Sequence, residues 1–248
     1  LCPDITFSLY DVCEDLFRIP NERSGMDGEF DNLNEKYLRE NGGIVFPNPN
    51  APTGGEMPLS EIEEIVAKNP DSVVIVDEAY VDFGGVSALP LVDKYENLLV
   101  VQTFSKSRAL AGMRIGFAIG QKKLISYLND VKFSFNSYTM NRLTIACGKA
   151  CVEDSAYFQE ITGKIVATRE WTKQKLTELG FTFPDSKANF IFATHKSVPA
   201  QELFENLKTA GIYVRYFKKP RIDNYLRITV GTQAEMERLV EVLAALVK

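Results

Sequence analysis

The sequence predicts an α/β fold with a mostly parallel sheet, followed by a smaller α/β unit. Two observations carry this prediction. Apolar runs of strand length alternate with amphipathic helical segments through about residue 120, which is the pattern of strand–helix–strand units. The last 70 residues or so then alternate strand and helix again, on a smaller scale.

Composition narrows the function classes. The chain has 248 residues, of which 45% are hydrophobic and 25% charged, with a net charge of −5 and no basic cluster, so a nucleic acid or an anionic membrane is not the expected partner. No apolar run approaches the roughly 20 residues that span a bilayer. One histidine, and four cysteines without a Cys-x-x-Cys pair, provide little material for a metal site, and none is expected. So few cysteines fit a reducing cytoplasm.

The first half of the chain is expected to contribute most of the sheet. Helices are predicted at residues 8–16, 31–40 and 60–68, and strands at 17–20, 44–46, 72–76, 96–101 and 114–119. Ser60 with Glu63 three residues later matches a capping box at a helix start. The run 72–76 is almost entirely β-branched, as in a strand that is buried on both faces.

The second half is expected to begin with helices. A helix is predicted at 122–128, a loop at 133–137, and a long helical pattern at 141–179 that breaks near Asp154-Ser155. After it come strands at 188–193, 211–215 and 225–230, and helices at 200–210 and 233–246.

A lysine among hydroxyl groups follows the strand at 96–101. Thr103 and Ser105 precede Lys106, and Arg114 follows eight positions later. A lysine amine can form a Schiff base with an aldehyde, while hydroxyls and a guanidinium hold a phosphate. Pyridoxal phosphate (PLP) has both groups. The same spacing also fits a surface loop with two solvated cations.

Polar residues also follow the two preceding strands. Asp77 directly follows the run 72–76. A carboxylate at the end of a buried strand is costly unless it is paired, and a protonated pyridine nitrogen would be a suitable partner. Tyr80 lies three residues further on. A stiff loop with three prolines, at 47–54, follows the strand at 44–46, and it offers Asn50 to a ligand. The alternatives are a strand-end aspartate that caps a turn and an ordinary turn asparagine.

These motifs resemble a known family. Residues 105–117 read Ser-Lys-Ser-Arg-x-Leu-Ala-Gly-Met-Arg-Ile-Gly-Phe, which resembles the lysine segment of fold-type I PLP aminotransferases, and of histidinol-phosphate aminotransferases in particular. Residues 48–54 and 77–83 resemble two further motifs in the order that this family uses, and the likeness continues to residues 226–232. It implies the fold-type I PLP-transferase architecture, with residues 1–148 as the remainder of the PLP-binding large domain and 149–248 as the small domain.

The resemblance implies a set of catalytic and cofactor-binding residues. Lys106 would bind the PLP aldehyde and then move the proton between the substrate Cα and the cofactor. Asp77 would keep the ring nitrogen charged, and Tyr80 would donate to the 3′-oxygen. The phosphate would be held by Thr103, Ser105 and Arg114.

The resemblance also assigns residues around the ring and the substrate. Phe7 would cover the ring, although it could equally be a core residue. Relatives carry an asparagine where this chain has Ala51, so Asn50 is the candidate substitute. Arg227, on an otherwise apolar strand, would hold the carboxylate or acidic end of the substrate, and Arg215 would help bind a substrate phosphate. The alternative for both arginines is an internal salt bridge.

The resulting hypothesis is a homodimeric, cytoplasmic aminotransferase that uses PLP. Its small-molecule substrates would be histidinol phosphate and 2-oxoglutarate, and its products imidazole acetol phosphate and glutamate, a step of histidine biosynthesis. Alternatives are an aromatic aminotransferase, a threonine-phosphate decarboxylase, or an inactive fragment that only binds or dimerises. Family members extend further toward the N-terminus, so the resemblance implies that this sequence lacks an N-terminal part.

Overall fold

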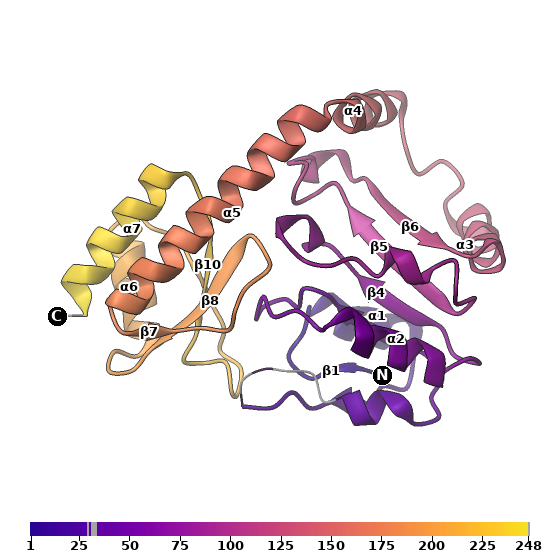
Figure 1. Cartoon of the computed structure of the whole chain (residues 1–248), viewed down its shortest axis with the longest axis horizontal. Coiled ribbons are helices and arrows are strands. Elements are labelled where there is room, and N and C mark those ends of the chain that lie inside the picture. The colour runs from indigo at the N-terminus through magenta and orange to yellow at the C-terminus, as the bar shows by residue number, and fades with distance from the viewer. Residues whose placement is uncertain (29, 31–33, 248) are drawn as a thin grey trace.

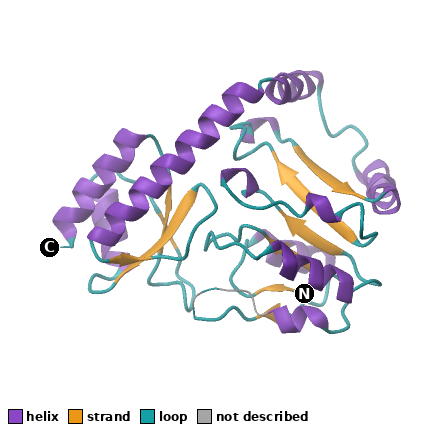
Figure 2. Ribbon diagram, viewed as in Figure 1, coloured by secondary structure: helices purple, strands orange, loops and turns teal. Residues whose placement is uncertain are grey.

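The computed structural model describes residues 1–28, 30 and 34–247 and contains two separate four-stranded sheets (Figures 1 and 2). The α-helices are α1 (Leu9–Phe17), α2 (Leu59–Lys68), α3 (Lys122–Phe135), α4 (Arg142–Glu153), α5 (Ser155–Glu178), α6 (Ala200–Thr209) and α7 (Gln233–Leu246). The strands are β1 (Cys2–Pro3), β2 (Arg23–Ser24), β3 (Ile44–Pro47), β4 (Val74–Asp77), β5 (Leu98–Thr103), β6 (Gly116–Gly120), β7 (Phe181–Thr182), β8 (Phe190–His195), β9 (Arg215–Tyr216) and β10 (Leu226–Thr229). Short 3-10 helices are η1 (Asn34–Leu38), η2 (Val81–Phe83), η3 (Leu89–Leu91) and η4 (Ala111–Met113).

The first sheet has the order β3-β4-β5-β6. β3, β4 and β5 are parallel, and β6 turns back antiparallel to β5. Helix α2 packs its apolar stripe of Ile62, Ile65 and Val66 into the core of this sheet. Parallel strands end at one edge, so the residues that follow β3, β4 and β5 meet there.

The second sheet has the order β7-β8-β10-β9, with antiparallel pairs throughout. Helices α5, α6 and α7 cover it and complete a second hydrophobic core, which includes Leu176, Leu203 and Leu239. A capping box fixes the start of α7, because the Thr232 hydroxyl accepts from the Glu235 N–H and the Glu235 carboxylate accepts from the Thr232 N–H. The α/β class and the mostly parallel first sheet are confirmed.

Several predicted elements of the first half are wrong in detail. No strand forms at 17–20, because Phe17 continues α1 and Arg18 caps it with a left-handed backbone (φ 55°). Ser60 is not an N-cap; α2 begins at Leu59 after Pro58, without a side-chain cap. In the predicted helix 31–40, residues 31–33 lie outside the described residues and the remainder contains only η1.

Elements of the second half also differ from the prediction. The loop predicted at 133–137 is helical through Phe135, because α3 runs on past Leu128. The strand predicted at 114–119 begins only at Gly116, and the strand predicted at 211–215 is reduced to β9. The helix break at Asp154 is confirmed, because this residue caps α5 by accepting from the Tyr157 N–H at 3.1 Å. The division at residues 148 and 149 falls inside α4 and stays a prediction.

Helix α5 runs from the second sheet toward the first and carries a guanidinium that connects them (Figure 1). Arg169 is 3% exposed, and its Nη1 donates at 2.8 Å to the carbonyls of both Phe83 and Ala188. A backbone contact lies nearby: the Lys187 N–H donates to the Gly54 carbonyl at 2.9 Å. Gly54 has φ +82°, and a Cβ there would lie 2.4 Å from Ser186 Oγ, so only glycine fits.

Within the described residues, none of the helices is both long and apolar enough to cross a membrane.

We predict that Arg169→Met lowers the free energy of unfolding by about 2–4 kcal/mol, because two buried carbonyls lose their donor. Urea unfolding followed by circular dichroism measures the change. The control is Arg238→Met, which removes a guanidinium that is 58% exposed and pairs only within α7, and which should stay within about 0.5 kcal/mol of wild type. Equal effects of the two substitutions would contradict the bridging role of Arg169.

Candidate active site

The carboxyl edge of the first sheet brings Asp77, Tyr80 and Lys106 together. Asp77 is the last residue of β4, and Lys106 follows β5 by three residues. The Nζ of Lys106 lies 5.3 Å from the centre of the Tyr80 ring, and its positive charge acts on the Asp77 carboxylate. An amine, a phenol and a carboxylate therefore share one small volume, as their positions in the sequence predict.

Asp77 is held as a buried carboxylate by several partners. Burial raises its pKa, while hydrogen bonds from the Tyr10 hydroxyl and the Ala79 N–H, and the charge of Lys106, act in the opposite direction. The Tyr10 hydroxyl donates to Oδ2 at 2.9 Å, and the Ala79 N–H donates to Oδ1 at 3.1 Å. Glu78, the next residue, is bound separately by Ser87, Ala88 and Gln102.

The hydroxyl residues around Lys106 form a small network. Thr103 Oγ1 lies 2.9 Å from Ser105 Oγ and accepts from the Ser105 N–H at 3.1 Å. On the other side of the lysine, the buried Ser107 hydroxyl donates to the Asp82 carboxylate. The segment that carries Lys106 is therefore fastened on both sides, while the Lys106 side chain itself is exposed.

Arg114 lies close in sequence but is turned outward. It is exposed, has a left-handed backbone (φ 56°) at the end of η4, and donates to the Ala111 carbonyl at 3.0 Å. Left-handed conformations of non-glycine residues cost free energy and cluster at functional sites. Its predicted role at a phosphate stays a prediction.

Arg227 and Arg215 line one cavity between the second sheet and the N-terminal segment. They are cross-strand neighbours on β10 and β9. The cavity measures about 460 Å³, and Phe7, Ala51 and Lys219 also line it. Phe7 is 45% exposed and meets the Tyr10 ring edge-on at 6.0 Å. The structure thus brings three of the predicted residues, Arg227, Arg215 and Phe7, to one cavity, whose lining includes Lys219 and Asp4 as well.

Arg227 is a half-buried arginine on a mostly apolar strand. Its Nε is buried without a hydrogen-bond partner, and neither it nor Arg215 forms an ion pair within the described residues. Its charge lies over the rings of Phe190 and Phe217, at 5.2 and 5.9 Å. Burial, and then the charge of Arg215, lower its pKa. An internal salt bridge, the alternative considered from the sequence, is absent from the described residues.

The predicted role of Asn50 stays a prediction. Its amide donates to the Ile5 carbonyl at 3.1 Å and to Thr53 Oγ1 at 2.9 Å, which leaves its buried Oδ1 without a partner. Ala51, in contrast, packs with Ala188, Phe190 and Tyr80. Ala51, the residue that departs from the family pattern, therefore packs near Tyr80.

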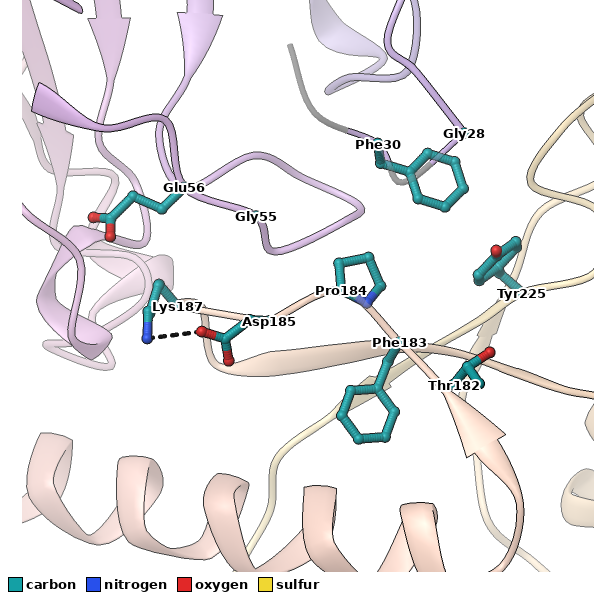
Figure 3. A pocket seen from close by; sticks show the side chains of 10 residues that line it. All are labelled: Gly28, Phe30, Gly55, Glu56, Thr182, Phe183, Pro184, Asp185, Lys187 and Tyr225. Atoms are coloured by element: carbon teal, nitrogen blue, oxygen red, sulfur yellow. Dashed lines mark ion pairs between the residues drawn. The ribbon is translucent and has the colours of Figure 1, made fainter. Parts of the chain in front are cut away.

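A larger cavity, of about 640 Å³, lies elsewhere (Figure 3). It opens between the Gly55-Glu56 turn and the segment 182–187, where Asp185 pairs with Lys187 at 3.0 Å. None of the predicted site residues lines it, so size alone does not identify the site.

Tyr10 is a site residue that the sequence analysis does not identify. Its partner Asp77 is 67 positions away, and no local pattern reports such a contact. Thr6 was also missed; its hydroxyl is buried without a partner, and the residue lines the same cavity as Arg227.

The chain belongs to the class I and II aminotransferase family, whose pattern matches residues 11–243. Enzymes of this class are transaminases that depend on PLP. The first sheet of the chain, with a lysine beyond β5 and an aspartate at the end of β4, is consistent with this assignment.

Close relatives share one particular name. Histidinol-phosphate aminotransferase of Lactococcus lactis subsp. lactis is 51% identical over 248 residues, which are 100% of this chain and 69% of that protein. The enzyme of the same name from Clostridium beijerinckii is 49% identical over 98% of this chain and 68% of its own length. The crystal structure of the Sinorhizobium meliloti enzyme in complex with PLP covers 99% of this chain and 69% of its own, with a TM-score of 0.88 at 22% identity, and shows the same fold.

The residues present fit PLP. Asp77 offers a carboxylate that is already desolvated and still has free acceptor positions, which suits a protonated ring nitrogen. Lys106 offers an exposed amine beside it.

We predict that Arg227→Met leaves the melting temperature unchanged or raises it in phosphate-free solution, because it removes an unpaired, partly buried charge. Added inorganic phosphate should raise the melting temperature of wild type more than that of the variant, as differential scanning fluorimetry can measure. Arg39→Met, which removes an exposed arginine, serves as the control and should respond like wild type. An identical phosphate response in all three proteins would rule out an anion site at Arg227.

Proposed function

We propose that this chain transfers the amino group of histidinol phosphate to 2-oxoglutarate with PLP bound at the carboxyl edge of the first sheet. The observation that carries the proposal is the meeting of Lys106, Tyr80 and Asp77 beside the cavity of Arg227 and Arg215. The names of relatives that are 49% and 51% identical support the choice of substrate.

Each of the site residues has a distinct task in this proposed reaction. PLP, when bound, supplies an aldehyde for the amino group and a ring that stabilises negative charge at the substrate Cα. The Lys106 amine would hold the cofactor and would carry the proton that leaves the substrate Cα. Asp77 keeps a positive charge on the ring nitrogen, and Tyr80 donates a hydrogen bond to the ring oxygen. Thr103, Ser105 and Arg114 hold the cofactor phosphate, and Phe7 covers the ring.

We assign substrate recognition to the cavity that Arg227 and Arg215 line, which we call the two-arginine cavity. Histidinol phosphate carries a dianionic phosphate, and 2-oxoglutarate carries two carboxylates, so each needs cations beside its anionic groups. Arg227 and Arg215 present two guanidiniums on adjacent strands, with Lys219 on the same cavity wall. Two guanidiniums can grip a phosphate or a carboxylate through paired hydrogen bonds.

We predict that PLP gives the purified chain a visible absorbance band, and that borohydride then attaches the cofactor to the peptide that contains Lys106. Lys106→Ala should lose this attachment and at least about 10³-fold in turnover, because the amine both binds the cofactor and moves the proton. Spectrophotometry and peptide mass spectrometry measure these changes.

The control for this experiment is Lys68→Ala, at the end of α2, which should keep both the band and the attachment site. Turnover is compared for histidinol phosphate, an aromatic amino acid and threonine phosphate, with 2-oxoglutarate as acceptor. Preference for either of the latter two would replace the proposed substrate, and attachment at another lysine would contradict the assignment of Lys106.

We also propose that the chain acts in the cytoplasm as a homodimer. Its four cysteines are unpaired, which fits a reducing compartment. Helices α3 and α4 each carry several apolar side chains that are more than half exposed, and exposed apolar surface of this kind marks protein interfaces. They are Tyr127, Val131, Phe133, Phe135, Leu143, Ile145 and Val152.

We predict a native mass of about twice the 27.8 kDa of one chain, measured by size-exclusion chromatography with light scattering. Val131→Ser with Phe135→Ser should shift the mass toward that of one chain, because it removes two side chains that are 66% and 91% exposed. Tyr213→Ser, on the second unit and 79% exposed, is the matched control. A single-chain mass for wild type at micromolar concentration would contradict the proposal.

A further inference from the structure

Tyr10 makes one directed contact into the candidate active site. Its hydroxyl donates to Asp77 Oδ2 at 2.9 Å. The Ala79 N–H binds the other carboxylate oxygen, at 3.1 Å. An ionised carboxylate has about four acceptor positions, so these two bonds orient the group while leaving it able to accept another donor.

The helix that carries Tyr10 depends on polar contacts for its position. Helix α1 has no fully buried residue, and Leu16 and Phe17 on it are 71% and 68% exposed. Arg23 binds it from one side, by pairing with Asp11 and with Glu14 at 2.6 Å. The contact between Tyr10 and Asp77 fastens it to the end of β4. Phe7, which lies just before the start of α1 and meets the Tyr10 ring edge-on, lines the cavity of Arg227 and Arg215.

The contact between Tyr10 and Asp77 pairs a protonated phenol with a carboxylate. Burial, followed by the Asp77 charge and the hydrogen bond to it, raises the pKa of Tyr10, so the phenol keeps its proton. For Asp77, the hydrogen bond from Tyr10 is the largest influence that lowers the pKa. Within the described residues, the titratable groups that face Asp77 are Tyr10 from α1 and Lys106 from the segment after β5.

We propose that Tyr10 is a positioning residue, which holds the Asp77 carboxylate ionised and correctly aimed for the protonated ring nitrogen of PLP. This role rests on the proposed function. It assigns to α1 a part in assembling the cofactor site, transmitted through Asp77 rather than through contact with reacting atoms. Tyr10 adds to the residues whose roles the family resemblance implies.

Tyr10→Phe tests the role, because phenylalanine keeps the ring and its edge contact with Phe7 while removing the hydroxyl. We expect the dissociation constant for PLP, measured by fluorescence quenching on the cofactor-free protein, to rise about tenfold. Tyr213→Phe, at an exposed position, should leave it unchanged. Binding by Tyr10→Phe that is equal to or tighter than wild type would overturn the proposal, since the hydroxyl would then only occupy the place of the cofactor.

A second measurement needs no cofactor. The pKa of Asp77 is raised by burial, so its ionised form disfavours folding at neutral pH, and this cost disappears as the pH falls and the carboxyl is protonated. The Tyr10 hydroxyl offsets part of the cost. Tyr10→Phe should therefore lower the urea midpoint more at neutral than at mildly acidic pH, and in an Asp77→Asn background this pH dependence should vanish. A pH-independent effect would overturn the charge-holding role.

The two failures can be told apart. A wild-type chain that binds no PLP overturns the proposed function, and with it the role of Tyr10 toward the cofactor. A wild-type chain that binds PLP, with unchanged binding in Tyr10→Phe, overturns the role of Tyr10 alone.

Discussion

The arrangement of the whole site depends on one buried guanidinium. Arg169 reaches from α5 to the carbonyls of Phe83 and Ala188, both at 2.8 Å. Phe83 lies three residues after Tyr80, and Ala188 lies two residues before Phe190. The Tyr80 and Phe190 rings meet edge-on at 5.1 Å, and Arg227 lies over Phe190. Through these contacts Arg169 joins the two units at the place where the lysine edge of one sheet faces the arginine strand of the other.

Near the contacts of Arg169, two polar groups are desolvated at a cost in folding free energy that a purely structural core would avoid. Asp77 is a desolvated carboxylate, and Arg227 has a buried Nε with no partner. Both costs are present in the chain by itself, so the groups are oriented before any ligand arrives. Preorganised charges of this kind stabilise developing charge without further rearrangement. Opposite charges are also kept apart, since the carboxylate belongs to the first sheet and the guanidiniums to the second.

The sequence predicts the local parts of this design well and the long-range parts poorly. The β-branched run before Asp77 predicts its strand, and the spacing of Asp77, Tyr80 and Lys106 indicates a common edge, because parallel strands end together. Arg227 is conspicuous because it interrupts an apolar strand. Short-range details fail where two outcomes have similar local propensity, as at Phe17, which continues a helix rather than starting a strand. The contacts of Tyr10 and Arg169 span 67 and 86 positions, and only the folded chain reveals them.

The close approach at Gly54 limits which substitutions in this chain can change the angle between the two sheets. The two units touch there through backbone, with no side chain between the Gly54 carbonyl and the Lys187 N–H, and Ser186 excludes even a methyl group. The angle between the sheets is therefore difficult to adjust by substitution at this point. Arg215 and Lys219, in contrast, line the cavity, and substitution there changes the wall of the cavity rather than the backbone contact at Gly54. The joint between the sheets and the chemistry of the cavity wall are in this sense set by separate parts of this chain.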